Sequence, residues 1–246
     1  MRYLILSDIH GNLEALHAVV ADARGDYGAV LCLGDVVGYG ADPNAVTDWT
    51  RAHAQVTVRG NHDRACTGQI DLQWFNPVAQ ASVLWTKTLL TPENTEWLRN
   101  LPAGPLPVDD FSLVHGSPAD EDQYLLDADD VGPASACCAS RTIFFGHTHV
   151  QGGFELRGHR ALRIEKPGLG DRERVFEFGV ADRVLINAGS VGQPRDRDPR
   201  AAYTLYDPAE PRVTFRRVAY DLAAAQRKIR AAGLPSLLAD RLADGR

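Results

Sequence analysis

Residues 3–11 read Tyr-Leu-Ile-Leu-Ser-Asp-Ile-His-Gly, a short apolar run that is followed at once by polar residues. The apolar part, Tyr3–Leu6, is typical of a buried strand that leads into a loop. Asp8 and His10 stand two positions apart, so in an extended chain their side chains lie on one side while Ile9 points to the other. The final glycine permits a tight turn of the backbone. The stretch therefore predicts a strand whose carboxyl end presents a carboxylate beside an imidazole.

The same order of strand, polar loop and helix continues along the chain. Asn12 is expected to cap a helix, because apolar residues recur at helical spacing through residues 13–23. Ala29–Leu33 reads as a second strand, and Asp35 follows it after a glycine. A shorter helix is expected around Asn44–Ala52. Strands that alternate with helices in this way indicate βαβ units and a parallel sheet.

A third strand, Gln55–Val58, stops at residues 60–63, which read Gly-Asn-His-Asp. From Leu106 onward the pattern becomes rich in strands. Phe111–Val114 runs into His115, and Thr142–Phe145 runs into residues 146–149, Gly-His-Thr-His. Further strands are expected near Gly153–Leu156, Arg160–Ile164, Arg174–Phe178, Val184–Ile186, Ala202–Tyr206 and Arg212–Val218, before a basic helical tail at Leu222–Arg230. In open α/β sheets, functional loops gather at the carboxyl ends of the strands.

Residues 66–104 interrupt this rhythm with helical stretches around Val78–Leu89 and Pro92–Asn100. The segment holds three of the four tryptophans together with Phe75: Trp74, Trp85 and Trp97. Packing of these rings against the core is favoured over a cap that faces a substrate, although the sequence leaves both open. Without an internal repeat, a low-complexity segment or a clear linker, residues 1–246 are expected to form a single domain that contains this helical insertion.

Composition excludes several classes of protein. Hydrophobic residues make up 44% and charged residues 24%, which is ordinary for a folded protein with a full core. The formal net charge of −6 disfavours non-specific nucleic-acid binding, although bound cations would still attract a small anionic substrate. No run approaches the ~18 apolar residues of a membrane span, and no secretory signal is recognisable. The four cysteines are expected to be reduced packing residues, so a cytoplasmic location is predicted.

The histidines are unevenly distributed. Five of the eight fall in the loops that follow the expected strands, namely His10, His62, His115, His147 and His149. The other three, His17, His53 and His159, lie in ordinary helix or hairpin contexts and are expected to have no ligand role. Carboxylate, amide and imidazole donors without a thiolate suit Mn²⁺, Fe or Zn²⁺, and do not resemble a cysteine-rich structural zinc site.

Taken in order, these motifs resemble the complete signature of the calcineurin-like metallophosphoesterases, nearest to their small bacterial and archaeal phosphodiesterase branch. The matching motifs are Asp8-x-His10, Gly34-Asp35-x-x-Gly38, Gly60-Asn61-His62-Asp63, His115 and Gly146-His147-x-His149. Each motif alone is weak, but their combination and order are specific. The resemblance implies an α/β fold with two mixed β-sheets packed as a sandwich and flanked by helices, in four layers α-β-β-α.

The resemblance also implies a centre of two divalent metal ions, most simply Mn²⁺, with Fe or Zn²⁺ as alternatives. Asp8, His10, Asp35 and His149 would hold one ion. Asp35, Asn61, His115 and His147 would hold the other, with Asp35 as the bridge. Two such cations clamp phosphate oxygens and activate a water that attacks phosphorus. His62 would protonate the leaving oxygen or donate a hydrogen bond to the phosphoryl group.

Two features of the sequence indicate to which branch of this superfamily the chain is most similar. Ser/Thr protein phosphatases of this superfamily carry an Asp-Arg pair where this chain has Gly38 and Tyr39, which argues against that activity. Tyr39 is expected to pack or to donate from its hydroxyl, with stacking on a nucleobase as the alternative. Residues 187–195, Asn-Ala-Gly-Ser-Val-Gly-Gln-Pro-Arg, resemble a loop of the small prokaryotic members. Arg195 either contacts a substrate phosphate or pairs with the neighbouring Asp196 or Asp198.

The predicted function is hydrolysis of a phosphodiester or of a nucleotide phosphoanhydride by a water that the two metal ions activate. A phosphomonoesterase, including a protein phosphatase, is the alternative, and a metal-binding scaffold without activity is a third possibility that the full ligand set disfavours. The expected partner is a small phosphorylated substrate such as a nucleotide, which Asn12, Tyr39 and Arg195 are candidates to contact. The sequence leaves the substrate, the native metal and the oligomeric state open.

Overall fold

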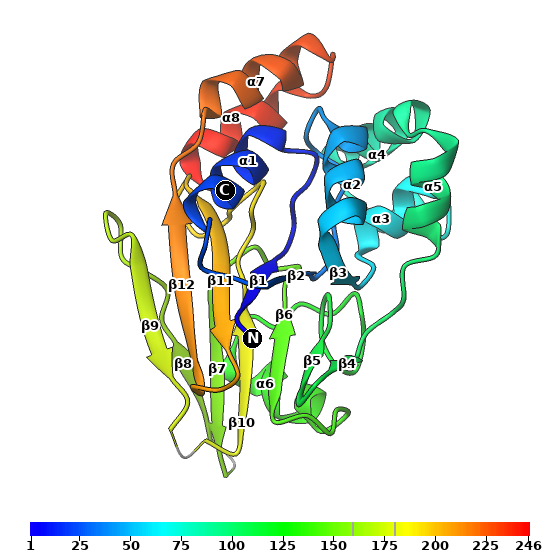
Figure 1. Ribbon diagram of the computed structural model, residues 1–246. Helices are drawn as coiled ribbons and strands as arrows, with labels where there is room; N and C mark the ends of the chain where they lie inside the picture. Colours follow the sequence, from blue (N-terminus) through cyan, green and yellow to red (C-terminus); the bar gives the residue numbers. More distant parts are fainter. Residues whose placement is uncertain (159, 180) are drawn as a thin grey trace.

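A computed structural model describes residues 1–158, 160–179 and 181–246. Its strands form two six-stranded sheets that pack face to face (Figure 1). The first sheet has the order β3 (Ala54–Thr57), β2 (Ala29–Cys32), β1 (Tyr3–Leu6), β11 (Ala201–Asp207), β12 (Arg212–Val218) and β9 (Glu173–Glu177). The second has the order β4 (Leu106–Val108), β5 (Phe111–Leu113), β6 (Thr142–Phe145), β10 (Arg183–Asn187), β7 (Gly152–Arg157) and β8 (Arg160–Ile164).

Both sheets are mixed. Strands β1, β2 and β3 run parallel to one another, as the alternation of strands and helices predicts, and β11 pairs antiparallel with β1. In the second sheet β5, β6 and β10 are parallel, and antiparallel strands flank them. The C-terminal strand β11 therefore lies next to the N-terminal strand β1, so distant parts of the sequence complete one sheet.

Each face of β1 is buried against a different layer. Tyr3 and Ile5 belong to the cluster between the two sheets, together with residues of the second sheet such as Phe144. Leu4 and Leu6 point the other way and pack with the helices that cover the first sheet. A strand buried on both faces is apolar throughout, because each of its side chains leaves water. This explains the continuous run in the sequence.

Helices cover the outer faces of the two sheets. The helices on the side of the first sheet are α1 (Leu13–Asp22), α2 (Pro43–His53), α3 (Asn61–Cys66), α4 (Pro77–Leu89), α5 (Pro92–Arg99), α7 (Leu222–Ala231) and α8 (Ser236–Asp244), with a short 3₁₀ turn, η1 (Leu72–Trp74). Helix α1 contacts β11 and β12, and α7 packs on α1. Helix α6 (Ala128–Ser135) covers the second sheet and contacts β7 and β8. The predicted two-sheet sandwich flanked by helices is confirmed.

Three helices differ from the sequence expectation. Residues 60–63 were expected to be a loop, but α3 begins at Asn61, directly after the glycine that precedes it. Helix α6 has no counterpart among the helices expected from the sequence, and Asp127 and Asp130 form its capping box. Helix α8 follows the expected C-terminal tail and buries Leu238 and Leu242. In the described ranges, no helix is both long and apolar enough to cross a membrane.

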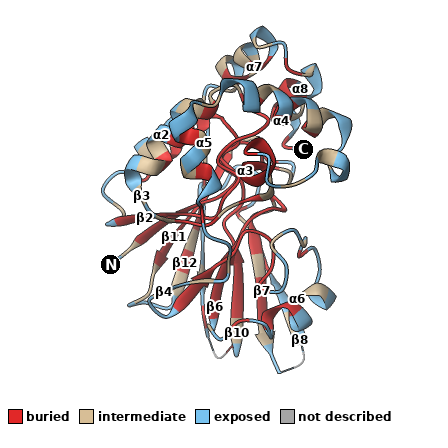
Figure 2. Ribbon diagram, turned by 90° about the vertical axis from the view of Figure 1, so that its right-hand side faces the viewer, coloured by how far each residue is buried: buried red, intermediate tan, exposed pale blue. Residues whose placement is uncertain are grey.

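Buried residues gather along the strands and in the segments that connect the strand ends to the helices, as Figure 2 shows. The exposed residues lie on the outer faces of the helices and at the far ends of the sheets. A polar site in those connecting segments is therefore held by buried backbone on all sides.

Candidate metal centre

Five strand ends, three from the first sheet and two from the second, bring the expected ligand residues together. The residues that follow β1, β2, β3, β5 and β6 supply them: Asp8 and His10, Asp35, Asn61, His115, and His147 with His149. Backbone hydrogen bonds join these segments directly. Asp8 N–H donates to Gly34 O, and His10 N–H donates to Asp35 O, each at 3.0 Å.

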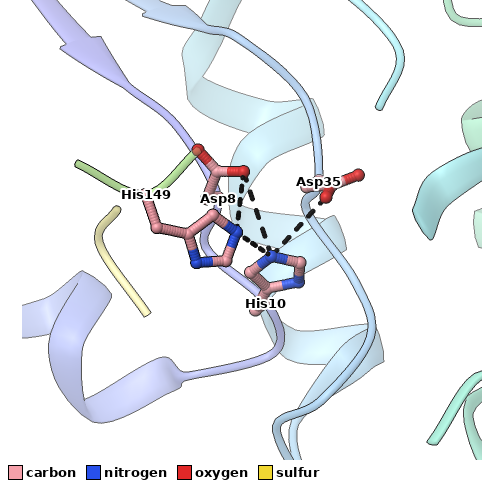
Figure 3. A group of neighbouring side chains, drawn as sticks. All are labelled: Asp8, His10, Asp35 and His149. Atoms are coloured by element: carbon pink, nitrogen blue, oxygen red, sulfur yellow. Dashed lines mark hydrogen bonds and ion pairs between the residues drawn. The ribbon is translucent and has the colours of Figure 1, made fainter. Parts of the chain in front are cut away.

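One group of four side chains converges at the end of β1. The potential ligand atoms of Asp8, His10, Asp35 and His149 all lie within 4.8 Å of one another, and all four residues are buried (Figure 3). His10 Nε2 lies 3.1 Å from His149 Nε2 and 3.5 Å from Asp35 Oδ2. Asp8 Oδ1 lies 3.3 Å from His149 Nε2. This geometry matches a four-ligand metal site without thiolates.

A second group shares Asp35. Its members, Asp35, His115 and His147, also place one ligand atom each within 4.8 Å of the others. Asp35 Oδ2 lies 3.5 Å from His115 Nε2, the same distance as from His10 Nε2 in the first group. Asn61 Oδ1 is 3.2 Å from His115 Nε2. One carboxylate oxygen therefore stands between the two groups.

Main-chain carbonyls fix the tautomer of every imidazole in the two groups. A carbonyl only accepts, so the ring nitrogen beside it carries the proton. The Nδ1–H groups of His10, His115 and His149 donate to backbone carbonyls at 3.0, 2.8 and 2.6 Å. His147 uses the opposite nitrogen, with Nε2–H donating to Asp122 O at 3.1 Å. The other nitrogen of each ring faces the centre, and in His10, His147 and His149 it is unprotonated, as in metal-ligating histidines.

These atoms fit a cation and are poorly matched to one another without one. The Nε2 atoms of His10 and His149 both carry lone pairs, yet they lie 3.1 Å apart. Asp8 Oδ1 is buried without a hydrogen-bond donor, whereas Asp8 Oδ2 accepts from Ser7 Oγ and His147 N. Buried acceptors that face one another are stabilised by a positive charge between them.

The protonation states agree with metal binding in most of the site. Burial lowers the pKa of His147 to about 3, and it holds the pKa of His10 well below its ordinary value, so both rings are neutral. Burial raises the pKa of the Asp35 carboxyl, but the neighbouring His115 and His62 imidazoles outweigh it and keep Asp35 ionised. Burial lowers the pKa of His115, but the Asp35 carboxylate raises it to about 10. A proton on His115 therefore balances Asp35 in the protein alone.

The backbone of the site is held in an uncommon conformation. Five of the expected ligands and Tyr39 have φ between 48° and 63°: Asp8, His10, Asp35, His147 and His149. Asp and His tolerate this left-handed region better than most residues do. Such conformations cost about 1–3 kcal/mol each and are kept only where the surrounding structure enforces them. The hydrogen bonds between the strand-end segments provide that enforcement.

His62 lies beside the two groups, in the first turn of α3. Its ring packs between Tyr39 and Phe75, with ring centroids 4.3 and 5.1 Å away, and its Nδ1 has no hydrogen-bond partner. Burial lowers the pKa of His62 to about 4. Gly38, which replaces the aspartate of the protein phosphatases, stands directly against this ring. The site therefore lacks at position 38 the carboxylate that would orient His62.

Gly38→Ala is expected to displace His62. An added Cβ would stand 2.5 Å from His62 Nδ1, and Gly38 has a φ of +90°, which side-chain-bearing residues rarely adopt. Overpacking of this kind lowers the free energy of unfolding by about 1–3 kcal/mol. Thermal denaturation and kcat would both be measured, and both are expected to fall.

Gly132→Ala is the matched control, because Gly132 lies in α6 with open space around its Cα and an ordinary φ. Alanine in a helix interior is favoured over glycine by about 1 kcal/mol, so this variant is expected to keep its activity and stability. A Gly38→Ala protein with unchanged kcat and thermal midpoint would show that His62 does not need this space.

Asp63 is a site residue to which the sequence reading gave no role. Its carboxylate accepts from the backbone N–H groups of Asp35 and Gly60 at 2.8 and 3.0 Å, and from that of Val37 at 3.2 Å. It thereby ties the loop after β2 to the start of α3. The sequence does contain a signal for this role, since an acidic residue three positions after a helix N-cap is the pattern of a capping box.

The three candidate substrate contacts are placed differently. Asn12 is buried; its Oδ1 accepts from Ala15 N and its Nδ2 donates to Gly192 O, so its amide ties helix α1 to the loop at Gly192. Tyr39 is also buried and packs on His10 and His62, and it lines a pocket beside the centre.

Arg195 does not pair with its neighbours in the sequence. Asp196 and Asp198 are both engaged by other basic residues. Arg195 Nη2 instead donates to Tyr39 Oη at 3.3 Å and to Gln193 Oε1 at 3.2 Å, and its Nε has no partner. The expected pairing with Asp196 or Asp198 is therefore absent, and a contact between Arg195 and a substrate phosphate stays a prediction.

The other three histidines were expected to have no ligand role. His17 and His53 lie on the exposed faces of α1 and α2, away from the site, and His159 lies outside the described residues. Glu121 and Asp122 form ion pairs with Arg64 of α3, and Glu121 also pairs with Arg59.

The sheets, the helices and the convergent carboxylates and imidazoles define a class of metal-dependent phosphoesterases. A model of the calcineurin-like phosphoesterase superfamily domain matches residues 1–210, and the chain belongs to this superfamily. An uncharacterized protein of Methanocaldococcus jannaschii is 35% identical over 253 residues, which cover 98% of this chain and 97% of that protein.

Solved structures agree with this assignment. A metallophosphoesterase from Sphaerobacter thermophilus has a TM-score of 0.89 at 38% identity, with 100% of this chain and 99% of that chain covered. A hypothetical protein from Pyrococcus horikoshii has a TM-score of 0.77 at 18% identity, with 100% and 98% covered, which shows the shared fold. The chain is therefore a member of a family of hydrolases that act on phosphate esters, with candidate metal ligands in place.

Proposed function

We propose that this protein hydrolyses a phosphodiester or a nucleotide phosphoanhydride with the help of two divalent metal ions, most simply Mn²⁺. The observation that carries the proposal is Asp35 Oδ2, which lies 3.5 Å from an imidazole nitrogen of each ligand group. Asp8, His10, Asp35 and His149 would hold one ion. Asp35, Asn61, His115 and His147 would hold the other.

When bound, two such ions supply electrostatic stabilisation of phosphate oxygens and a lowered pKa for water. The chain's own residues do the rest. The carbonyl-fixed imidazoles keep the ligand geometry constant, so little reorganisation is needed during the reaction. His62, packed beside the centre, donates a hydrogen bond to the phosphoryl group or a proton to the leaving oxygen. Arg195 contributes a charge-assisted contact to a phosphate oxygen.

Metal loading is expected to stabilise the fold. An ion that binds only the native state at about 100 times its Kd adds about 2.7 kcal/mol to the free energy of unfolding. For a chain of this size, that raises the thermal midpoint by about 5–10 °C. Calorimetry of protein treated with EDTA, before and after addition of Mn²⁺, measures the change, and removal of the ion should reverse it. Identical midpoints with and without Mn²⁺ would contradict a metal centre at these residues.

The direct test is a panel of substrates with Mn²⁺-loaded protein. It compares a bis-aryl phosphate, an aryl monophosphate, cyclic nucleotides and dinucleoside polyphosphates. We expect turnover of diesters or anhydrides to exceed turnover of the monoester, because His62 lacks the carboxylate partner that the protein phosphatases place beside it. Preference for the monoester would favour the phosphomonoesterase alternative, and no turnover of any compound would favour a scaffold.

We further propose that residues 1–246 act as one domain in the cytoplasm. The pairing of β11 with β1 supports the single domain, because the two ends of the chain complete one sheet. The four cysteines are free thiols, which suits a reducing compartment.

A further inference from the structure

A pocket of about 580 Å³ opens beside the metal centre. Asn61, His62 and His147, all at the centre, line it. Tyr124 and several residues of the helical insertion between positions 70 and 79 line it as well. Because the pocket is continuous with the candidate ligands, whatever group fills it remains attached to, or adjacent to, the phosphate that the centre binds.

Aromatic rings form the walls of this pocket. Trp74 is 85% exposed at the pocket rim, and Phe75 beside it packs edge-on against His62. Tyr124, which also lines the pocket, stacks on His147, with ring centroids 4.0 Å apart at an interplanar angle of 26°. An exposed indole that lines a pocket together with further aromatic rings is a candidate binding surface.

The two other tryptophans of the insertion behave differently. Trp85 and Trp97 are partly buried and pack against hydrophobic clusters of the helices. The sequence reading, which favoured packing for all three rings, is therefore wrong for Trp74. Its ring faces solvent and lines the pocket instead.

Polar groups at the rim complement the rings. Asp71 Oδ1 accepts from Gln73 N, and Asn76 Oδ1 accepts from the first N–H groups of α4. These contacts hold both side chains in place and leave the second carboxylate oxygen of Asp71 and the Asn76 amide N–H₂ for other partners. One acceptor and one donor, fixed beside an indole, suit the polar edge of a planar heterocycle. An acyl chain would gain nothing from them.

We propose that this pocket receives the nucleobase of the substrate, with Trp74 as the stacking surface, so that the hydrolysed compound is a nucleotide ester or anhydride. The inference rests on the proposed function for the phosphate and on the pocket for the base. The volume lies within the usual range of small-molecule sites. Bases stack on aromatic side chains without strong dependence on their identity, so a preference among bases would come from Asp71 and Asn76.

Binding of adenosine to the Mn²⁺-loaded protein tests the pocket without any phosphate chemistry. Calorimetric titration is expected to give a measurable Kd for adenosine and none for ribose. Trp74→Ala is expected to weaken adenosine binding about tenfold, in line with the usual strength of base stacking, and Trp74→Phe should restore most of it. Leu84→Ala removes an exposed apolar residue of α4 outside the pocket and should leave Kd unchanged.

The outcomes separate this proposal from the proposed function. Adenosine that binds no better than ribose, in protein that hydrolyses a bis-aryl phosphate, would overturn the nucleobase pocket and leave the phosphoesterase intact. Adenosine binding that depends on Trp74, in protein that hydrolyses nothing, would support the nucleobase pocket and overturn the proposed phosphoesterase activity. Equal binding of phenol and adenosine, equally weakened by Trp74→Ala, would make this a general aryl pocket and overturn the assignment to a base.

Discussion

Asp35→Asn is expected to lower kcat by about 10²–10³-fold or more and to leave the protein with fewer than two bound metal ions. The amide removes a negative charge from the atom that both ligand groups share, since Asp35 Oδ2 lies 3.5 Å from both His10 Nε2 and His115 Nε2. Loss of one preorganised electrostatic contact alone has effects of this order. Metal content per chain would be measured by elemental analysis after reconstitution with Mn²⁺, alongside steady-state kinetics.

Asp48→Asn is a suitable control, because Asp48 is an exposed carboxylate on α2 far from the site. It removes the same charge and should retain two ions and full turnover. If the Asp35→Asn protein instead binds two ions and keeps its kcat, Asp35 does not bridge the two ions. Intact secondary structure by circular dichroism is needed for both variants, because Asp35 also accepts from His62 N–H at 2.8 Å.

His62→Ala is expected to keep both metal ions and to lose about 10²–10⁴-fold in kcat. A positioned proton or hydrogen-bond donor typically contributes this much. The ring of His62 is buried beside the ligands, but the residues grouped around each potential ion do not include it. Its alanine variant should therefore separate metal content from turnover.

His17→Ala provides the comparison, since His17 is an exposed histidine of α1. The two variants change the same side chain in different surroundings and are expected to bind metal equally. Loss of metal from His62→Ala alone would instead place His62 among the ligands. Equal kcat in the two variants would remove it from the reaction.

The positions of the candidate ligands were predictable because each depends on a local pattern. A buried strand has an apolar run, and the polar residue that ends it marks the carboxyl edge where parallel strands meet. Asp8, Asp35 and His115 were found in this way. Their convergence needed one further fact, that the ends of three strands of the first sheet meet the ends of two strands of the second. The alternation of strands and helices supplied it for the first three.

What the sequence could not supply depends on contacts between distant segments. The tautomer of His147 is set by a carbonyl of Asp122, 25 residues away in the chain. The exposure of Trp74 follows from the way the insertion docks, since its composition resembles that of the packed rings Trp85 and Trp97. Arg195 faces Tyr39, which lies 156 positions earlier in the sequence. The spacing of apolar residues indicates only local helices and strands, so it cannot predict contacts between residues this far apart in the sequence.

The left-handed backbone at the ligands sets the native side chains against the backbone. Glycine adopts that conformation without strain, so at these positions a substitution that abolishes metal binding can at the same time relax the chain. Aspartate and histidine at the five positions are therefore held at a cost in backbone strain, which contacts with a bound metal ion would offset.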